Sequence, residues 1–263
     1  MSVLGDFYRL ETGELKPVIE SSTEVKLQVA DSWLVEDGRA RSLQAHFDRF
    51  ANWVLAIDPD EEQRLKLFFA EVKRLLPREG TWFPRLEYHG EQPAGLRLYL
   101  RLRPAPQKLE AITLWTYSES DPRVNAEVKG PDLSLCQQLR RAANMNGADE
   151  AVITNSMGFV AEGALSALVW WRGDTLCSSD DKTNWLPSIT RSEVFQIAKQ
   201  MGFETKEEAV YPADLAKLPI WALSSLNGIM PVRSWVQVAK DIPESSHLEA
   251  FTRRLKMLGT QLE

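Results

Sequence analysis

The residues that decide the fold are 147–163, which read GADEAVITNSMGFVAEG. The run 150–155 is short, mostly apolar and rich in β-branched side chains, which is typical of a buried strand. Turn-forming residues follow, and residues 159–171 then predict a turn and a further strand. On the other side, residues 133–146 have a helical pattern. The local order is therefore helix, buried strand, turn and strand.

The N-terminal half predicts strands and two helices. Residues 24–36 have strand character, and 81–116 alternate as several strands. A helical stripe is formed by Leu43, Phe47, Phe50 and Val54, at spacings of four, three and four. A second helix is predicted over 60–77, because acidic residues stand at its start, where the helix dipole favours them.

The polar segment 118–132 contains two prolines and is interpreted at its front as a linker between two domains. We predict an α+β protein with a small N-terminal domain, 1–120, and a larger C-terminal domain, 121–263. In the second domain a helix is expected to start at Thr190 as N-cap, with Glu193 at the capping-box spacing. A strand over 220–225 and a helix over 246–258 complete the expected elements.

The composition restricts the function classes. The chain has 263 residues, 44% hydrophobic and 26% charged, with a net charge of −6. We therefore expect a globular protein that binds neither nucleic acid nor membrane, since it has no basic excess and no apolar run of about 20 residues. The early acidic residues argue against a signal peptide, and two cysteines without a metal-like or disulfide-like spacing favour the cytoplasm. Three scattered histidines predict no metal site.

Five motifs give the chain a recognisable plan. Lys129 lies 18 residues before Gly147 (147 − 129), ahead of the predicted helix. GFVAEG (158–163) places Glu162 in an apolar turn, and LPSITR (186–191) opens a helix. Ser224 and Ser225 precede a Pro-Val pair, and HFDRF (46–50) contains Arg49. This ordered set resembles the class IV aminotransferase family, the fold type IV pyridoxal-phosphate enzymes, over roughly residues 25–235.

The resemblance implies a role for each motif. Lys129 is the Schiff-base lysine and proton shuttle, and Glu162 holds the pyridine nitrogen of pyridoxal 5'-phosphate protonated. Because Glu162 has apolar neighbours, an unpartnered carboxylate there would be costly, which favours a partner. Leu186 packs on the cofactor ring. The residues that hold the phosphate are Arg49, Ile189, Thr190, Ser224 and Ser225. A helix N-terminus suits an anion in any case.

The chain also departs from the family pattern. Ser134 stands where a tyrosine is common, and Ser188 replaces the glycine of the phosphate turn. Leu165-Ser166-Ala167 and Cys177-Ser178-Ser179 replace two other family signatures. These differences leave the substrate open. Three arginines share one face of a predicted strand and are candidate carboxylate ligands, although a solvent-facing row on an edge strand explains them equally well: Arg97, Arg101 and Arg103.

We therefore predict a pyridoxal-phosphate-dependent class IV aminotransferase-like enzyme with a barrel-like sheet in its larger domain. It acts on an amino acid or an amino-containing carboxylate, with a 2-oxo acid as partner substrate in the case of transamination. The reaction is either transamination or β-elimination of the aminodeoxychorismate-lyase kind. By resemblance the enzyme is a homodimer. The alternative is a non-catalytic binding or regulatory module that keeps the fold.

Overall fold

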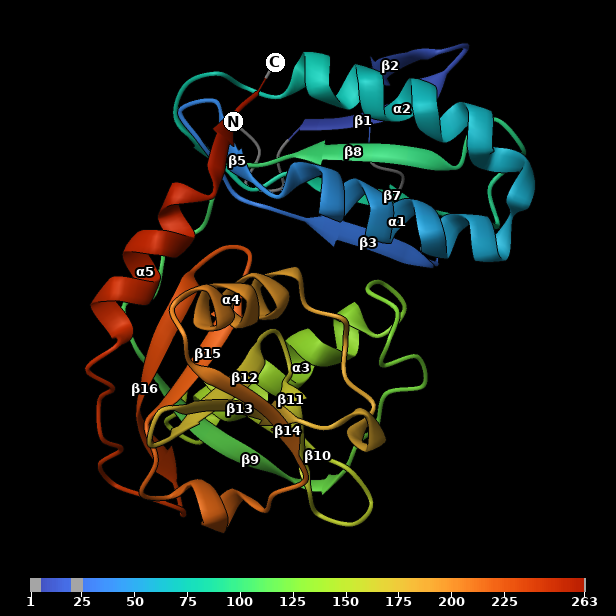
Figure 1. Ribbon diagram of the computed structural model, residues 1–263. Coiled ribbons are helices and arrows are strands. Elements are labelled where there is room, and N and C mark those ends of the chain that lie inside the picture. Colours follow the sequence, from blue (N-terminus) through green and yellow to red (C-terminus); the bar gives the residue numbers. More distant parts are fainter. Residues whose placement is uncertain (1–5, 20–25, 263) are drawn as a thin grey trace. The chain divides into compact units, whose positions relative to one another are not determined.

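The computed structural model describes residues 6–19 and 26–262. The chain divides into two compact units. The first unit comprises Met1–Gln107, Val128–Pro131 and Leu258–Glu263, and the second comprises Lys108–Glu127 and Asp132–Met257. Figure 1 labels the helices and strands and colours them by their position along the chain.

The first unit is built on a five-stranded antiparallel sheet in the order β2-β1-β8-β7-β3. Its strands are β1 (Asp6–Glu11), β2 (Glu14–Pro17), β3 (Val29–Ser32), β7 (Arg85–Tyr88) and β8 (Leu98–Leu102). A smaller sheet has the order β17-β5-β4-β6. Its strands are β4 (Val35–Glu36), β5 (Arg39–Arg41), β6 (Thr81–Trp82) and β17 (Gly259–Gln261).

Two helices pack against the larger sheet of this unit: α1 (Leu43–Ile57) contacts β3, and α2 (Glu62–Leu75) contacts β2 and β8. A short 3-10 turn, η1 (Pro59–Glu61), joins them. The predicted stripe of α1 faces the core, where Phe47, Phe50 and Val54 are buried. The ring of Phe47 stacks on Phe69 of α2 at 4.4 Å between centroids. Aromatic burial of this kind stabilises the unit.

The second unit contains an eight-stranded mixed sheet in the order β11-β10-β9-β16-β15-β12-β13-β14. Strand β11, at one end of this order, also packs against β12 and β13, so the sheet curls back on itself as a partial barrel (Figure 1). The strands are β9 (Ile112–Ser120), β10 (Glu150–Thr154), β11 (Val160–Gly163), β12 (Ala167–Arg172), β13 (Thr175–Ser179), β14 (Glu204–Glu208), β15 (Ile220–Ser224) and β16 (Gly228–Val236).

Helices cover this curled sheet. α3 (Leu133–Met145) packs on β9 and β10, whereas α4 (Ile189–Gln200) packs on β12, β14 and β15. α5 (Leu248–Met257) contacts α4 and β16. Two 3-10 turns are η2 (Asp181–Thr183) and η3 (Pro212–Leu215). Between α4 and the sheet lies an aromatic core in which Trp171, Trp221 and Phe251 pack at 5.2–5.4 Å between centroids.

Most predicted elements are present at the predicted places, but some boundaries differ. The strands at 6–17 and 204–208 have few apolar side chains and were not predicted. Residues 24 and 25 of the first predicted strand lie outside the described residues. Strand β9 pairs with β16 at residues 112–115 and with β10 as far as Ser120. The whole strand therefore belongs to the second unit, which begins at Lys108, before the predicted boundary at 120.

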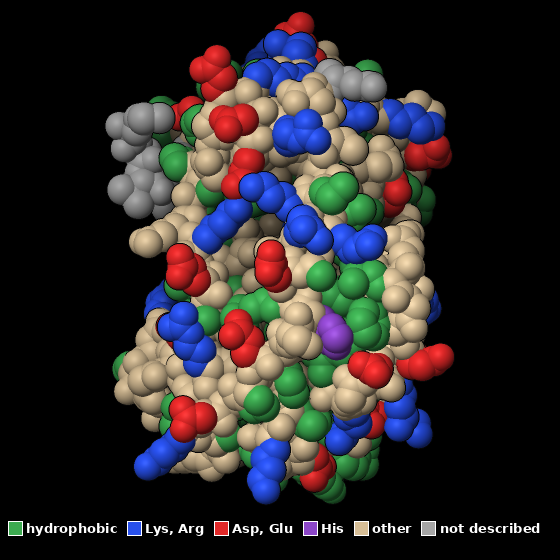
Figure 2. Space-filling view, turned by 60° about the vertical axis from the view of Figure 1, so that its left-hand side comes forward, with side chains coloured by type: hydrophobic (Ala, Val, Ile, Leu, Met, Phe, Trp, Pro, Cys, Tyr) green, Lys and Arg blue, Asp and Glu red, His purple; other side chains and the backbone are tan. Residues whose placement is uncertain are grey.

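The surface agrees with the modest charge of the sequence. Basic and acidic side chains both occur across the face shown in Figure 2, with hydrophobic side chains between them. Within residues 6–19 and 26–262, no helix has the length and apolar character needed to cross a membrane.

Candidate active site

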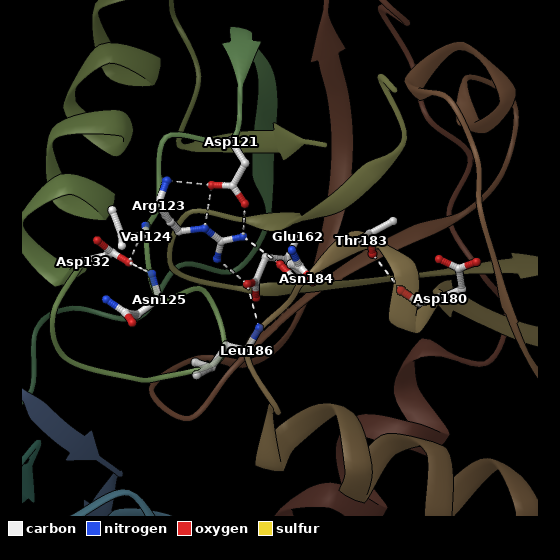
Figure 3. Close-up of polar contacts among 10 residues, drawn as sticks. All are labelled: Asp121, Arg123, Val124, Asn125, Asp132, Glu162, Asp180, Thr183, Asn184 and Leu186. Atoms are coloured by element: carbon white, nitrogen blue, oxygen red, sulfur yellow. Dashed lines mark hydrogen bonds and ion pairs between the residues drawn. The ribbon is translucent and has the colours of Figure 1, made fainter. Parts of the chain in front are cut away.

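Glu162 is a buried carboxylate on strand β11, with 5% of the residue exposed. Antiparallel pairing with β10 sets Glu162 opposite Ile153. Its Oε1 accepts a hydrogen bond from the backbone N–H of Leu186 at 2.8 Å and a second from Arg123 (Figure 3). The expectation that this acid is partnered rather than solvent-facing is therefore confirmed.

The turn after Glu162 requires glycine and is held by a second carboxylate. A Cβ at Gly163 would lie 2.4 Å from Ser166 Oγ and 3.0 Å from Glu150 Cγ, so a larger side chain would displace both. Glu150 accepts hydrogen bonds from Ser166 Oγ at 3.0 Å and from Leu165 N at 3.3 Å. Burial raises the pKa of Glu150 to about 7. Glu150 thus fixes the loop that leaves β11.

A small pocket in the second unit is lined by Glu162 together with residues from β12, β13 and the segment before α4. Leu186 and Trp185 form part of its wall. Ser179 also lines the pocket, and its buried Oγ has no hydrogen-bond partner within the described residues. A buried polar atom without a partner is costly, so the pocket is suited to a ligand with polar groups. The remaining lining residues are Ala161, Ala167, Leu168, Ser178 and Arg191.

Arg191 is a buried cation at the edge of this pocket. Its Nε donates to Ser178 Oγ at 3.1 Å, and its guanidinium forms an ion pair with Glu207. The same group lies 3.7 Å from the ring centroid of Trp185. Burial lowers the pKa of Arg191, which the charge of Glu207 opposes. Arg191 thus fastens the start of α4 to strands β13 and β14.

The start of α4 differs in one respect from the prediction. The N-cap is Ser188, whose Oγ accepts from Arg191 N at 3.2 Å; Thr190 is already helical, so the predicted N-cap was wrong. The reason is that Ser188 has the extended backbone that an N-cap needs, at φ −77° and ψ 121°. Ile189 and Thr190 are therefore the first two helical residues, where backbone N–H groups have no partner within the helix.

Lys129 belongs to the short segment Val128–Pro131 that groups with the first unit. Its backbone carbonyl accepts from Ala30 N at 2.6 Å. The next residue, Gly130, has φ 145°, and a Cβ there would lie 2.9 Å from backbone atoms of residues 28–30. The glycine after Lys129 is thus required by a close approach of two backbone segments.

Arg49 occupies a buried polar cluster on α1. Its Nε and Nη2 donate to Asp31 at 2.8 and 2.9 Å, and His46 Nδ1 lies 2.7 Å from the same carboxylate. Burial opposes ionisation of Asp31, but Arg49 and His46 hold the pKa of that carboxyl well below its usual range. This cluster fixes the guanidinium of Arg49 on the first unit.

The candidate substrate arginines all have partners within the first unit. Arg97 pairs with Asp58, while Arg101 Nε donates to Glu87 at 2.9 Å. Arg103 Nε donates to Phe83 O at 2.7 Å, and burial lowers the pKa of Arg103 to about 10. β8 lies between β1 and β7, so the alternative of a solvent-facing edge strand was wrong.

Ser224 and Ser225 lie at the end of β15 and in the turn that follows. Ser224 Oγ accepts from Asn227 N at 3.0 Å, which stabilises the turn into β16.

Within the second unit, the structure joins Glu162 to Leu186 by a hydrogen bond and places Ile189 and Thr190 shortly after Leu186. Sequence reasoning missed Arg123 and Ser179, because the partner of Arg123 is 39 residues away along the chain and serines are common.

The second unit thus combines a curled mixed sheet with a pocket in which a buried carboxylate lies near the start of a helix. Several solved structures have a similar fold. A hypothetical aminotransferase from Mycobacterium tuberculosis, in the form bound to α-ketoglutarate and PMP, is 20% identical with a TM-score of 0.81. The match covers 97% of this chain and 98% of that one. The same protein is also described in a PLP-bound form.

Two other solved structures are similar. Branched-chain amino acid aminotransferase from Escherichia coli is 16% identical, with a TM-score of 0.77 over 96% of this chain and 92% of that chain. A putative 4-amino-4-deoxychorismate lyase from Legionella pneumophila is 16% identical, with a TM-score of 0.72 over 91% and 96%. No curated protein sequence matches the chain.

The model of the amino-transferase class IV family matches residues 28–235. The chain belongs to this family. The membership confirms the recognition made from the motifs, the predicted fold class with its barrel-like sheet, and the prediction of an enzyme of the aminotransferase and lyase group.

Proposed function

We propose that this protein is a pyridoxal-phosphate-dependent enzyme that acts on an amino acid or an amino-containing carboxylate through a Schiff base at Lys129. The observation that carries the proposal is the buried Glu162 in a pocket that Ser179, whose buried Oγ has no hydrogen-bond partner within the described residues, also lines. A carboxylate that pairs with Arg123 is a suitable acceptor for a protonated ring nitrogen. The residues of the pocket therefore fit the cofactor.

Other residues would hold the cofactor at its remaining groups. Leu186 would pack against the ring, since it lines the same pocket as Glu162. Ile189 and Thr190, at the start of α4, would bind the phosphate through the helix N-terminus. Arg49, Ser224 and Ser225 are proposed as further phosphate ligands.

The cofactor, when bound, supplies an electron-withdrawing ring that stabilises negative charge at the substrate carbon. Glu162 retains the proton on the ring nitrogen and so maintains that withdrawal. The Lys129 amino group would remove the proton from the α-carbon of the substrate and later donate that proton to a different atom. Arg97, Arg101 and Arg103 stay candidates for binding the substrate carboxylate. The proposed assembly is a homodimer in the cytoplasm, a location that suits the buried thiols of Cys136 and Cys177.

The reaction is proposed as transamination or as β-elimination of the aminodeoxychorismate-lyase kind. The two differ in one requirement: transamination consumes a 2-oxo acid, whereas elimination releases a leaving group without one. Assays of amino donors with and without added 2-oxo acid therefore separate them.

The proposal is tested by the absorption spectrum of the purified protein with added pyridoxal phosphate. We expect a visible band from the cofactor linked to lysine, which is lost in Lys129→Ala and kept in Lys199→Ala, an exposed lysine on α4. Absence of the band in the unmodified protein at saturating cofactor would contradict the proposal and favour a non-catalytic module.

A further inference from the structure

Arg123 is a buried arginine in the loop before Lys129 that joins two carboxylates. Only 4% of its side chain is exposed. Its Nε and Nη2 donate to Asp121 at 3.0 and 2.8 Å, and Nη1 donates to Glu162. Nη2 also reaches the Asn184 carbonyl oxygen at 3.1 Å. Figure 3 shows the guanidinium between Asp121 and Glu162.

The loop that carries Arg123 is fastened on both sides. Asp121 N donates to Thr154 O at 3.0 Å, at the end of β10. Beyond Arg123, the carboxylate of Asp132 accepts from the backbone N–H groups of Val124 and Asn125, at 3.1 and 2.8 Å. The guanidinium is therefore held in place by loop geometry as well as by its ionic partners.

The electrostatics of this network favour the charged form of Arg123. Burial lowers the pKa of Arg123, but the hydrogen bond to Asp121 and the charge of Glu162 outweigh it, and the pKa is raised. Arg191 on α4 is a buried cation that lines the pocket with Glu162, and Glu150 on the neighbouring β10 is buried. A buried carboxylate that loses a neighbouring cation binds a proton more readily.

We propose that Arg123 is a positioning residue that holds Glu162 ionised and oriented, and thereby sets the preference of the site for a cofactor ring with a protonated nitrogen. This inference rests on the proposed function. It assigns to the loop before Lys129 a task beyond connecting the two units. That loop would support the ring-nitrogen partner as well as carry the lysine, which lies six residues further on (129 − 123).

The test is a comparison of two ligands by equilibrium binding, followed through tryptophan fluorescence. One is pyridoxal phosphate, and the other is its analogue with carbon in place of the ring nitrogen. Glu162 distinguishes them, so the unmodified protein should prefer pyridoxal phosphate. In Glu162→Gln the two ligands should bind with nearly equal affinity.

Arg123→Met is expected to reduce the same preference about tenfold, the scale of one charge-assisted hydrogen bond. Arg123→Lys, which keeps the charge, should restore part of it. The double variant with Glu162→Gln should lose no more than Glu162→Gln alone, because both act through one carboxylate. Arg172→Met is the matched control, since Arg172 pairs with Glu208 away from the pocket, and it should keep the full preference.

Two results would overturn the inference: an unchanged preference in Arg123→Met, or additive losses in the double variant. If Arg123→Met does not fold, Asp121→Asn weakens the hold on Arg123 without removing the charge, and an unchanged preference there counts equally against the inference. Failure of the proposed function is distinguishable, because the unmodified protein would then bind no pyridoxal phosphate through Lys129.

Discussion

Two buried glutamates, Glu87 in the first unit and Glu162 in the second, are held by arginines in different ways. Glu87 accepts from Arg85 Nε at 2.7 Å and Arg101 Nε at 2.9 Å, and lies 3.0 Å from His89 Nε2. All these partners come from β7, β8 and the residue after β7. Glu162 accepts from Arg123, on a loop, and from the backbone N–H of Leu186, and it lines a pocket.

The difference separates a carboxylate that holds a sheet together from one arranged for a ligand. Burial opposes ionisation of Glu87, but His89, Arg85 and Arg101 lower its pKa to about 2. The charges around Glu87 balance within the sheet. At Glu162, by contrast, the pocket is also lined by Ser179, whose buried hydroxyl has no hydrogen-bond partner within the described residues. Incomplete satisfaction beside a buried charge is characteristic of binding sites.

The largest effect is expected for the sheet carboxylate. Glu87→Gln leaves buried cations without their counter-charge, so the free energy of unfolding at pH 7 should fall by about 3–5 kcal/mol. Because the pKa of Glu87 is lowered from 4.5 to about 2 when folded, its contribution is present above pH 4.5 and is lost as the pH falls toward 2. Urea titrations at pH 7 and pH 3 should therefore show a smaller gap between the two proteins at pH 3. An equal gap would be evidence against this assignment.

Glu162→Gln, in contrast to Glu87→Gln, should reduce activity strongly and stability only slightly. Arg123 keeps its bonds to Asp121 in this variant, so the loss of stability should be smaller than for Glu87→Gln. With an amino donor that the protein accepts, kcat should fall about 10²–10³-fold, as for other losses of a preorganised charged partner. Steady-state kinetics and urea unfolding of both variants test this, and comparable losses of stability would remove the contrast.

Glu150 provides a third carboxylate that sharpens the comparison, because Ala151 N, Leu165 N and Ser166 Oγ donate hydrogen bonds to it. Burial raises its pKa from 4.5 to about 7, so the folded state binds its proton more tightly and stability falls as the pH rises from 4.5 through 7. Glu150→Gln should remove this dependence. Relative to the unmodified protein, its unfolding free energy should increase by up to about 3 kcal/mol between pH 5 and pH 8. A pH-independent difference would refute the raised pKa.

The smallest effect is expected at the start of α4. Ser188→Ala removes the cap on Arg191 N and should cost about 1 kcal/mol of unfolding free energy, whereas Ser188→Gly should cost only a few tenths. Both variants keep Glu162, so they test whether the helix start contributes stability independently of the carboxylate. Thermal unfolding of the two variants measures the difference, and equal losses would show that the cap is not the cause.

Much of the fold was predictable because it depends on local pattern. The stripe of α1, with Phe47, Phe50 and Val54 on one face, follows from a spacing that only a helix brings together. The buried strand β10 and the glycine after Glu162 were likewise marked by residue type. Strands β1 and β2 were not predicted; β2 is held by its hairpin with β1, and β1 pairs on its other side with β8, much further along the chain.

The candidate site likewise contains residues that the sequence predicted and features that it did not. Motifs identified Lys129, Glu162, Leu186 and the start of α4, since each is a short signature of local backbone geometry. Spacing alone misplaced the N-cap, because Ser188 and Thr190 are both suitable caps and only the backbone angles decide between them.

The family, the helices and buried strands, and the residues expected to carry the chemistry could be predicted from the amino-acid sequence, because these features depend on neighbours along the chain. The partners of the charged groups, by contrast, depend on the three-dimensional fold. Arg123 reaches Glu162 across 39 residues, and Arg101 reaches Glu87 on an interior strand rather than facing solvent on an edge. The physical reason is that a buried charge requires a counter-charge, and sheet topology determines which one lies within reach.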